Sequence, residues 1–241
     1  MSTSKTIVIT GASQGIGAGL VSSFLSRGYN VVATSRSVSR SNEIPTSEKV
    51  VRVDGDIADP ATAKMVFDTA LSRFGRIDAL VNNAGIFFAK PFIDYTAEDY
   101  RKLAATNIEG FLHLTQRVVR QMIDQKSGGS IVSITTPLVS HPIAGLPVSV
   151  AMITKGGIEA ASRNIAMEYA REGIRVNTVA PGVVDTPLHK DNPKDFLKTL
   201  SPMNSISTTQ EIVDAVIFLT EAPRITGEVL HVDGGAHLGK W

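Results

Sequence analysis

Cysteine is absent from this chain of 241 residues, which excludes disulfides and thiol chemistry and fits a reducing compartment. An excess of either charge is also absent: 24 lysines and arginines balance 23 acidic residues, so the composition gives no basis for nucleic-acid binding. No apolar run is long enough to cross a membrane, and the first expected strand begins within six residues, which leaves no room for a signal peptide. We therefore expect a cytoplasmic protein that binds neither nucleic acid nor membrane.

Strand-like and helix-like patterns alternate along the chain without internal repeats. The 43% hydrophobic content suffices for one large core. This alternation predicts an α/β fold: a doubly wound parallel sheet of about seven strands in a three-layer α/β/α, Rossmann-like arrangement. We expect one dinucleotide-binding and catalytic domain over 1–241, with a partly helical, mobile flap at 186–208. The expected strands are 6–9, 29–34, 49–53, 77–81, 130–135, 175–179 and 228–232. The main expected helices after the first are 59–74, 97–125 (broken or bent near Gly110), 149–171 and 210–221.

A glycine-rich turn links the first expected strand to a helix whose apolar residues recur at Ile16, Leu20, Val21 and Phe24. Glycines at such a turn let the backbone approach a phosphate, and the helix N-terminus offers unpaired N–H groups. The alternative is a tight turn without a ligand. We predict that the turn binds a dinucleotide phosphate through Gly11, Ser13, Gln14, Gly15, Ile16 and Gly17.

The second expected strand ends in Ser35-Arg36-Ser37. In a dinucleotide-binding fold this strand end meets the adenosine ribose, where an acidic residue would hold both hydroxyls. Here there is no acid, and the guanidinium of Arg36 suits a 2′-phosphate. The alternative is a solvated surface arginine. We predict NADP(H) as the cofactor, with Ser35 and Arg36 at the 2′-phosphate.

Further candidate binding residues follow the ends of later strands, where doubly wound folds bind ligands. Asp56 follows the third expected strand, and Asn83, Ala84 and Gly85 follow the fourth. Asn107 stands among apolar neighbours within an expected helix, so its amide either joins backbone segments or holds a water molecule.

Taken in order, these motifs and those that follow resemble the short-chain dehydrogenase/reductase family over the whole chain. The matching residues are Thr10-Gly11-x-x-x-Gly15-x-Gly17, Asp56, Asn82-Asn83-Ala84-Gly85, Asn107, Lys155, Asn177 and Pro181-Gly182-x-x-x-Thr186. Such a series is specific for the fold and less specific for activity.

The resemblance implies a role for each matching residue. Gly11, Gly15 and Gly17 would cradle the pyrophosphate, and Asp56 would meet the adenine amino group. Lys155 would bind the nicotinamide ribose, and Asn107 would hold a water in a proton relay. The remaining cofactor residues that we predict are Ile57 beside Asp56, Asn83 to Gly85 along the adenosine, and Pro181, Gly182 and Thr186, with Thr186 at the nicotinamide carboxamide.

One position departs from the family pattern. The family motif is Tyr-x-x-x-Lys, with the tyrosine as acid or base toward the substrate oxygen, and the residue four before Lys155 is Ala151. The family also has a serine that usually ends the strand before this motif, and no residue here clearly corresponds to it. Strict spacing gives Leu138, strand context gives Thr136, and nearness to Ala151 gives Ser140.

His141 lies in the same altered segment and could donate a proton near neutral pH. The alternative is a histidine that packs its loop. The other histidines, His113, His189, His231 and His237, show no metal-ligand spacing, so we predict no metal site. The candidate catalytic residues are Asn107, Thr136, His141 and Lys155.

Two functions remain open from the sequence. The first is an NADP(H)-dependent oxidoreductase that transfers hydride between the nicotinamide and a small carbonyl or imine substrate, with an atypical proton donor. The second is a dinucleotide-binding protein that has lost catalysis and acts as a sensor or partner subunit. The resemblance also implies a homodimer or homotetramer assembled through helices 97–125 and 149–171.

Overall fold

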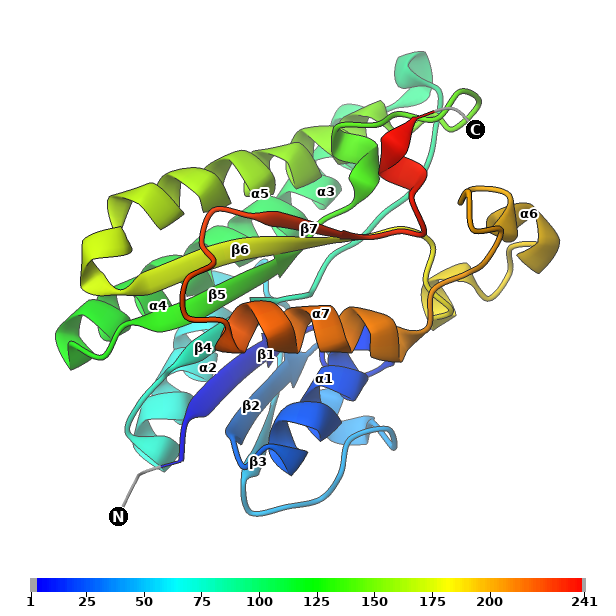
Figure 1. Cartoon of the computed structure of the whole chain (residues 1–241). Helices are drawn as coiled ribbons and strands as arrows, with labels where there is room; N and C mark the ends of the chain where they lie inside the picture. Colours follow the sequence, from blue (N-terminus) through cyan, green and yellow to red (C-terminus); the bar gives the residue numbers. More distant parts are fainter. Residues whose placement is uncertain (1–3, 240–241) are drawn as a thin grey trace.

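The structure, a computed structural model, describes residues 4–239 and contains one parallel sheet of seven strands (Figure 1). The strand order is β3-β2-β1-β4-β5-β6-β7, with β4 at the centre between β1 and β5. The expected doubly wound sheet is therefore confirmed. The strands are β1 (Thr6–Thr10), β2 (Asn30–Ser35), β3 (Val50–Asp54), β4 (Ala79–Asn82), β5 (Gly129–Ile134), β6 (Ile174–Pro181) and β7 (Val229–Val232).

The central strands are buried on both faces, and this explains their unbroken apolar sequences. Every residue of β1 and of β4 is buried. Ile7 and Ile9 of β1 pack into one apolar cluster, whereas Val8 packs into the other. Successive side chains of a strand point to opposite faces, so β1 joins the two halves of the core.

Helices cover both faces of the sheet (Figure 1). On one face α1 (Gly15–Ser26) and α7 (Thr209–Glu221) pack together, and their buried residues join the cluster that holds Ile7 and Ile9. On the other face lie α2 (Pro60–Phe74), α4 (Gly110–Gln125) and α5 (Ser149–Glu168). Most buried apolar residues of α2 and α4, and Ala166 of α5, join the cluster that holds Val8.

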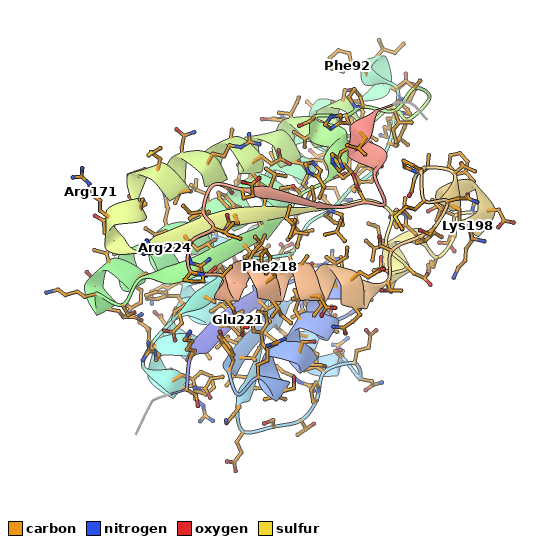
Figure 2. The ribbon with its side chains drawn as sticks, viewed as in Figure 1. Phe92, Arg171, Lys198, Phe218, Glu221 and Arg224 are labelled. Atoms are coloured by element: carbon orange, nitrogen blue, oxygen red, sulfur yellow. The ribbon has the colours of Figure 1, made fainter. Side chains whose placement is uncertain are left out.

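Close packing of α1 on α7 depends on Gly19. A Cβ atom there would lie 3.1 Å from methyl groups of both Thr209 and Val213. Arg27 and Glu221 add an ion pair between the same helices at 3.4 Å, but both side chains are well exposed, so the pair adds little stability. Figure 2 labels Glu221 on α7. Apolar contact around Gly19 therefore dominates this helix pair.

Helix ends follow the sequence signals closely. Asp59 caps α2 by accepting the Ala61 N–H at 2.8 Å, with Pro60 at the first helical position, and Gly75 ends the helix with a φ of 73°. The expected helix 149–171 is shorter than predicted, because α5 ends at Glu168 and a single 3-10 turn (Ala170–Glu172) follows it.

The expected helix 97–125 is divided, as predicted, just before Gly110. It consists of α3 (Ala97–Ala104), a π-helical turn (Ala105–Glu109) and α4. The π-helical turn inserts an extra residue into the helix and contains Asn107, which is buried. Such turns are frequent at functional sites, because they redirect a side chain without ending the helix.

The expected flap is partly helical. It contains a 3-10 turn (Pro187–His189) and the short helix α6 (Lys194–Lys198). In Figure 1 this segment extends beyond the carboxyl ends of the strands, at the right of the view. Among residues 4–239, no helix is long and apolar enough to cross a membrane.

Candidate cofactor and active site

The glycine-rich turn has the backbone geometry of a phosphate cradle. Gly11 and Gly15 have φ values of 64° and 57°, which favour glycine. A Cβ atom on Gly17 would overlap the carbonyl oxygen of Gly11 and lie 2.8 Å from the Cα of Ala12. The first turn of α1 therefore lies directly against β1, and its free N–H groups face the carboxyl edge of the sheet.

Thr10 and Asn83 hold this turn against the neighbouring strand end. The Thr10 hydroxyl accepts the backbone N–H groups of Asn83 and Ala84, at 3.1 and 3.0 Å. The Asn83 amide donates to the carbonyl oxygens of Thr10 and Gly11, at 2.9 and 3.0 Å. The family resemblance places the backbone around Asn83 along the adenosine, and the structure adds that the Asn83 side chain braces the glycine turn.

The predicted adenosine-side residues lie around the ends of β2 and β3. Arg36 is exposed directly after Ser35, whose hydroxyl oxygen accepts the Ser37 N–H at 3.3 Å. Asp56 accepts the Ala58 N–H at 3.0 Å, whereas Ile57 is buried, and its Cγ2 methyl would lie 2.8 Å from a Cβ on Gly110. Ile57 thus packs against the helix junction that carries Asn107.

Lys155, Asn107 and Gly85 converge at the ends of β4 and β5. A Cβ on Gly85 would lie 3.1 Å from the Lys155 Nζ and 3.2 Å from the Asn107 Oδ1. Lys155 donates to the Ile134 carbonyl oxygen at 2.8 Å, and burial lowers its pKa to about 8. The Lys155 ammonium group and the Asn107 amide oxygen thus both lie close to Gly85, which has no side chain.

The amide of Asn107 makes three hydrogen bonds within the protein. Its Oδ1 accepts the Ile86 N–H at 2.9 Å, and its Nδ2 donates to the Ile86 carbonyl oxygen and the Thr154 hydroxyl, at 3.1 and 3.0 Å. The Thr154 hydroxyl in turn donates to the Ala151 carbonyl oxygen at 2.8 Å. Asn107 therefore joins the segment after β4 to the first half of α5, which is the first of the two roles considered for it.

Ala151 is fully buried in a small apolar cluster with Leu103 and Val150. Phe87, Phe88 and Tyr95 pack against this cluster, and the Tyr95 hydroxyl donates to the Phe88 carbonyl oxygen at 2.8 Å. The methyl group of Ala151 therefore faces apolar side chains. Phe87 and Phe88, which follow the end of β4, are partly buried in this packing.

Thr136 follows β5 and caps a 3-10 turn (Pro137–Val139) by accepting the Leu138 N–H at 3.4 Å. Ser140 is exposed. Val139 lies against α5, since its Cγ1 would be 3.4 Å from a Cβ on Gly156. Of the three positions considered for the family serine, Thr136 is the nearest in sequence to Ile134, whose carbonyl oxygen accepts the hydrogen bond from Lys155.

His141 lies in a cluster of three imidazoles that the sequence spacing did not predict. Its ring centroid is 6.3 Å from that of His231 and 5.9 Å from that of His237, and the latter two rings stack at 4.1 Å. The His237 Nδ1 is 3.0 Å from both carboxylate oxygens of Asp233. Burial and the neighbouring His237 lower the pKa of His231.

The His141 Nδ1 atom is buried and has no hydrogen-bond partner in the described part of the chain. Within residues 4–239, no three metal-ligating side chains are arranged to hold an ion. These imidazoles come from three separate segments, the loop before α5, strand β7 and the turn after β7, so only the folded topology reveals the cluster.

The segment after β6 closes the site on the remaining side. Pro181 ends β6, and the Gly182 N–H donates to the Val232 carbonyl oxygen at 3.1 Å. Thr186 reaches the glycine turn, because its methyl group would be 3.3 Å from a Cβ on Gly15. Predicted cofactor residues from both ends of the chain thus lie together.

These features define a dinucleotide-binding α/β protein: a glycine cradle at a helix N-terminus and polar groups at the carboxyl edge of a parallel sheet. The residues fit a nicotinamide dinucleotide, because the cradle excludes side chains where phosphate must approach. The chain matches the family described as "Enoyl-(Acyl carrier protein) reductase" over residues 11–237. It belongs to the short-chain dehydrogenase/reductase family.

Three relatives illustrate the similarity. 3-Oxoacyl-acyl-carrier-protein reductase FabG of Salmonella typhimurium is 32% identical, over 97% of this chain and 98% of its own length. The structure of ElxO with NADP bound is 30% identical, with a TM-score of 0.87 and coverage of 98% and 99%. That of 3-ketoacyl-(acyl-carrier-protein) reductase from Brucella melitensis complexed with NADH is 27% identical, with a TM-score of 0.90 and coverage of 97% and 98%. The ElxO complex supports the prediction of an NADP(H) cofactor.

The lowered pKa of Lys155 predicts a specific effect on stability. Its folded-state pKa of about 8 is below the ordinary value of 10.5, so the unfolded chain binds the proton more readily. The charged lysine therefore costs stability at pH 7, and this cost is relieved as the pH rises from about 8 toward 10.5. Lys155→Met should unfold in urea with a free energy higher by about 1 kcal/mol at pH 7, because the residue is only partly buried and the lost hydrogen bond to Ile134 offsets part of the relieved cost.

The same comparison at pH 10 should show the advantage of Lys155→Met reduced. Lys64→Met on the exposed face of α2 serves as the control, because Lys64 pairs with Asp68 at the surface. Equal stability of Lys155→Met and the unmodified protein at both pH values would contradict the burial of this ammonium group.

Proposed function

We propose that this protein is an NADP(H)-dependent oxidoreductase that transfers hydride between the nicotinamide and a small carbonyl or imine substrate, with an atypical proton donor. One observation supports it above the others. Lys155 and Asn107 converge on Gly85 while the phosphate cradle around Gly17 is intact. A lysine of lowered pKa at the edge of a cofactor cradle is typical of a catalytic site.

Bound NADP(H) would supply or accept the hydride. The chain's own residues would hold it: Gly11 to Gly17 at the phosphates, Arg36 at the 2′-phosphate, and Thr186 at the carboxamide. Lys155 would donate to the nicotinamide ribose and contribute positive charge near the developing oxyanion. Asn107 would hold the loop at Ile86 in place and so keep Gly85 beside Lys155.

We propose further that the active site works without the tyrosine of its family, because Ala151 stands at that position. The methyl group cannot exchange a proton, and the surrounding apolar cluster leaves it fully buried. A positioned acid or base contributes about 10²- to 10⁴-fold, whereas holding two reactants together supplies about 7–11 kcal/mol in favourable cases. Loss of the tyrosine therefore slows hydride transfer without abolishing it.

His141 is the proposed replacement donor, with Thr136 as a hydroxyl partner at the end of β5. The Nδ1 of His141 has no hydrogen-bond partner among residues 4–239, so proton donation from it would break no bond there, although the loop at residue 141 must shift for a substrate to reach this buried atom. Its segment packs on α5 next to Lys155, through Val139 and Gly156. If no group replaced the tyrosine, the site would instead work best on substrates that need little proton assistance, such as activated carbonyls and iminium ions.

The alternative function is a dinucleotide-binding protein without turnover, which acts as a sensor or partner subunit. The burial of Ala151 supports it, since a binding protein has no need of an acid there. The retention of Lys155 and Asn107 is compatible with both functions, and turnover distinguishes them.

Assembly as a homodimer or homotetramer is also proposed. A groove of about 760 Å³ runs along α4 and reaches residues of α2 and α5. Apolar side chains on α4 and α5 are exposed. They include Leu112 and Ile123 on α4, and Ile153 and Met167 on α5. A second copy would cover them. A single domain over 1–241 and a cytoplasmic location stay predictions from the sequence.

Cofactor choice depends on Arg36 in this proposal. Arg36→Asp should weaken NADPH binding about 10-fold or more and reverse or erase the preference over NADH, because a carboxylate repels the 2′-phosphate and suits ribose hydroxyls. Fluorescence titration of both cofactors measures this. Arg73→Asp, an exposed change on α2, should leave both affinities unaltered. Equal or tighter NADH binding by the unmodified protein would refute the assignment.

Turnover tests the proposed reaction. We expect slow NADPH oxidation with activated carbonyls or imines, and little with plain ketones. His141→Ala should lower the rate about 10²-fold or more if His141 is the donor, whereas His113→Ala on α4 should have no effect. An unchanged rate in His141→Ala would exclude His141 as donor. NADPH binding without turnover on any substrate would favour the binding-only function.

A further inference from the structure

A carboxylate of the chain occupies part of the phosphate cradle. The Glu43 Oε2 accepts the backbone N–H of Gly15 at 3.1 Å. Gly15 is the first residue of α1, so this N–H is one of those that the helix leaves unpaired. Glu43 lies in the segment between β2 and β3, 28 residues away in the chain.

The position of Glu43 matters because a helix N-terminus attracts one class of group, an anion. A phosphate of NADP(H) at this N–H would meet the negative charge of Glu43 at the same donor. We propose that Glu43 is an internal competitor for the cofactor phosphate, which must leave Gly15 before the phosphate binds and so weakens dinucleotide binding.

The backbone that carries Glu43 is held firmly. The guanidinium of Arg52 donates to the carbonyl oxygens of Ser41 and Ile44, at 3.1 and 2.7 Å, and the Ile44 side chain is buried. The Ser41 hydroxyl donates to the Ser13 carbonyl oxygen at 2.6 Å, which ties this segment to the glycine turn itself.

The side chain of Glu43, in contrast, is exposed. Its carboxylate can therefore rotate into solvent while the anchored backbone stays in place. Moving the Glu43 carboxylate away from the Gly15 N–H therefore costs little free energy, and the position of this side chain alone decides whether the N–H is available. The short connection between β2 and β3, which contains a single 3-10 turn (Val38–Arg40), brings residue 43 within reach of Gly15.

Calorimetric titration of NADP+ without substrate tests this competition and needs no turnover. Glu43→Gln removes the charge but keeps the size of the side chain. It should bind NADP+ about 2- to 5-fold more tightly, which is the range expected for one charge at an exposed helix N-terminus. The control Glu48→Gln, an exposed carboxylate of the same segment, should leave the affinity unchanged.

NAD+ identifies which phosphate competes. An equal gain for NAD+ and NADP+ assigns Glu43 to the diphosphate, and a gain confined to NADP+ assigns it to the 2′-phosphate. Unchanged or weaker NADP+ binding by Glu43→Gln, or an equal gain in Glu48→Gln, would overturn the proposal. Because hydride transfer is not measured, this outcome is independent of whether the proposed reaction occurs.

Discussion

The contact between Gly17 and the backbone of Gly11 is the constraint on which the rest of the site depends. Any side chain at residue 17 would overlap the Gly11 carbonyl, so α1 can begin directly against β1 only with glycine there. This contact places the helix N-terminus at the carboxyl edge of the sheet. Thr10 and Asn83 then fix the neighbouring strand end, and Thr186 closes from the other side.

Much of this arrangement could be predicted from local sequence. Buried parallel strands have continuous apolar runs, and the glycine turn, the Asp59 cap and the short connection after β2 each follow from local chemistry. Gly110 correctly marked the division of the long helix. Its form, a π-helical turn around Asn107, is set by hydrogen bonds to Ile86 and Thr154, which lie far away in sequence.

Two features of the site could not be predicted because they depend on tertiary placement. His141, His231 and His237 come from three segments, and their spacing along the chain carries no signal. From the sequence alone, Glu43 would be expected to be a solvated loop residue. Only the anchoring of its segment by Arg52 and Ser41 shows that it reaches Gly15.

In the proposed function, the region around Ala151 allows the fold to retain its cofactor site without the tyrosine of its family. Ala151 is enclosed by apolar side chains, and the Thr154 hydroxyl accepts the Asn107 amide while it donates to the Ala151 carbonyl oxygen. These hydrogen bonds are made by Asn107, Thr154 and backbone groups, and Lys155 donates separately to the Ile134 carbonyl oxygen, so neither arrangement involves a tyrosine. In this account the cofactor half of the site and the proton-donating half are physically separable.

Direct transfer of a labelled hydride tests this account most sharply. NADPH carrying deuterium at nicotinamide C4 is incubated with the protein and an activated carbonyl or imine, and the product is analysed by mass spectrometry. The account predicts deuterium at the reduced carbon and a slower reaction than with unlabelled NADPH. Tight NADPH binding with no deuterium in any product would contradict it.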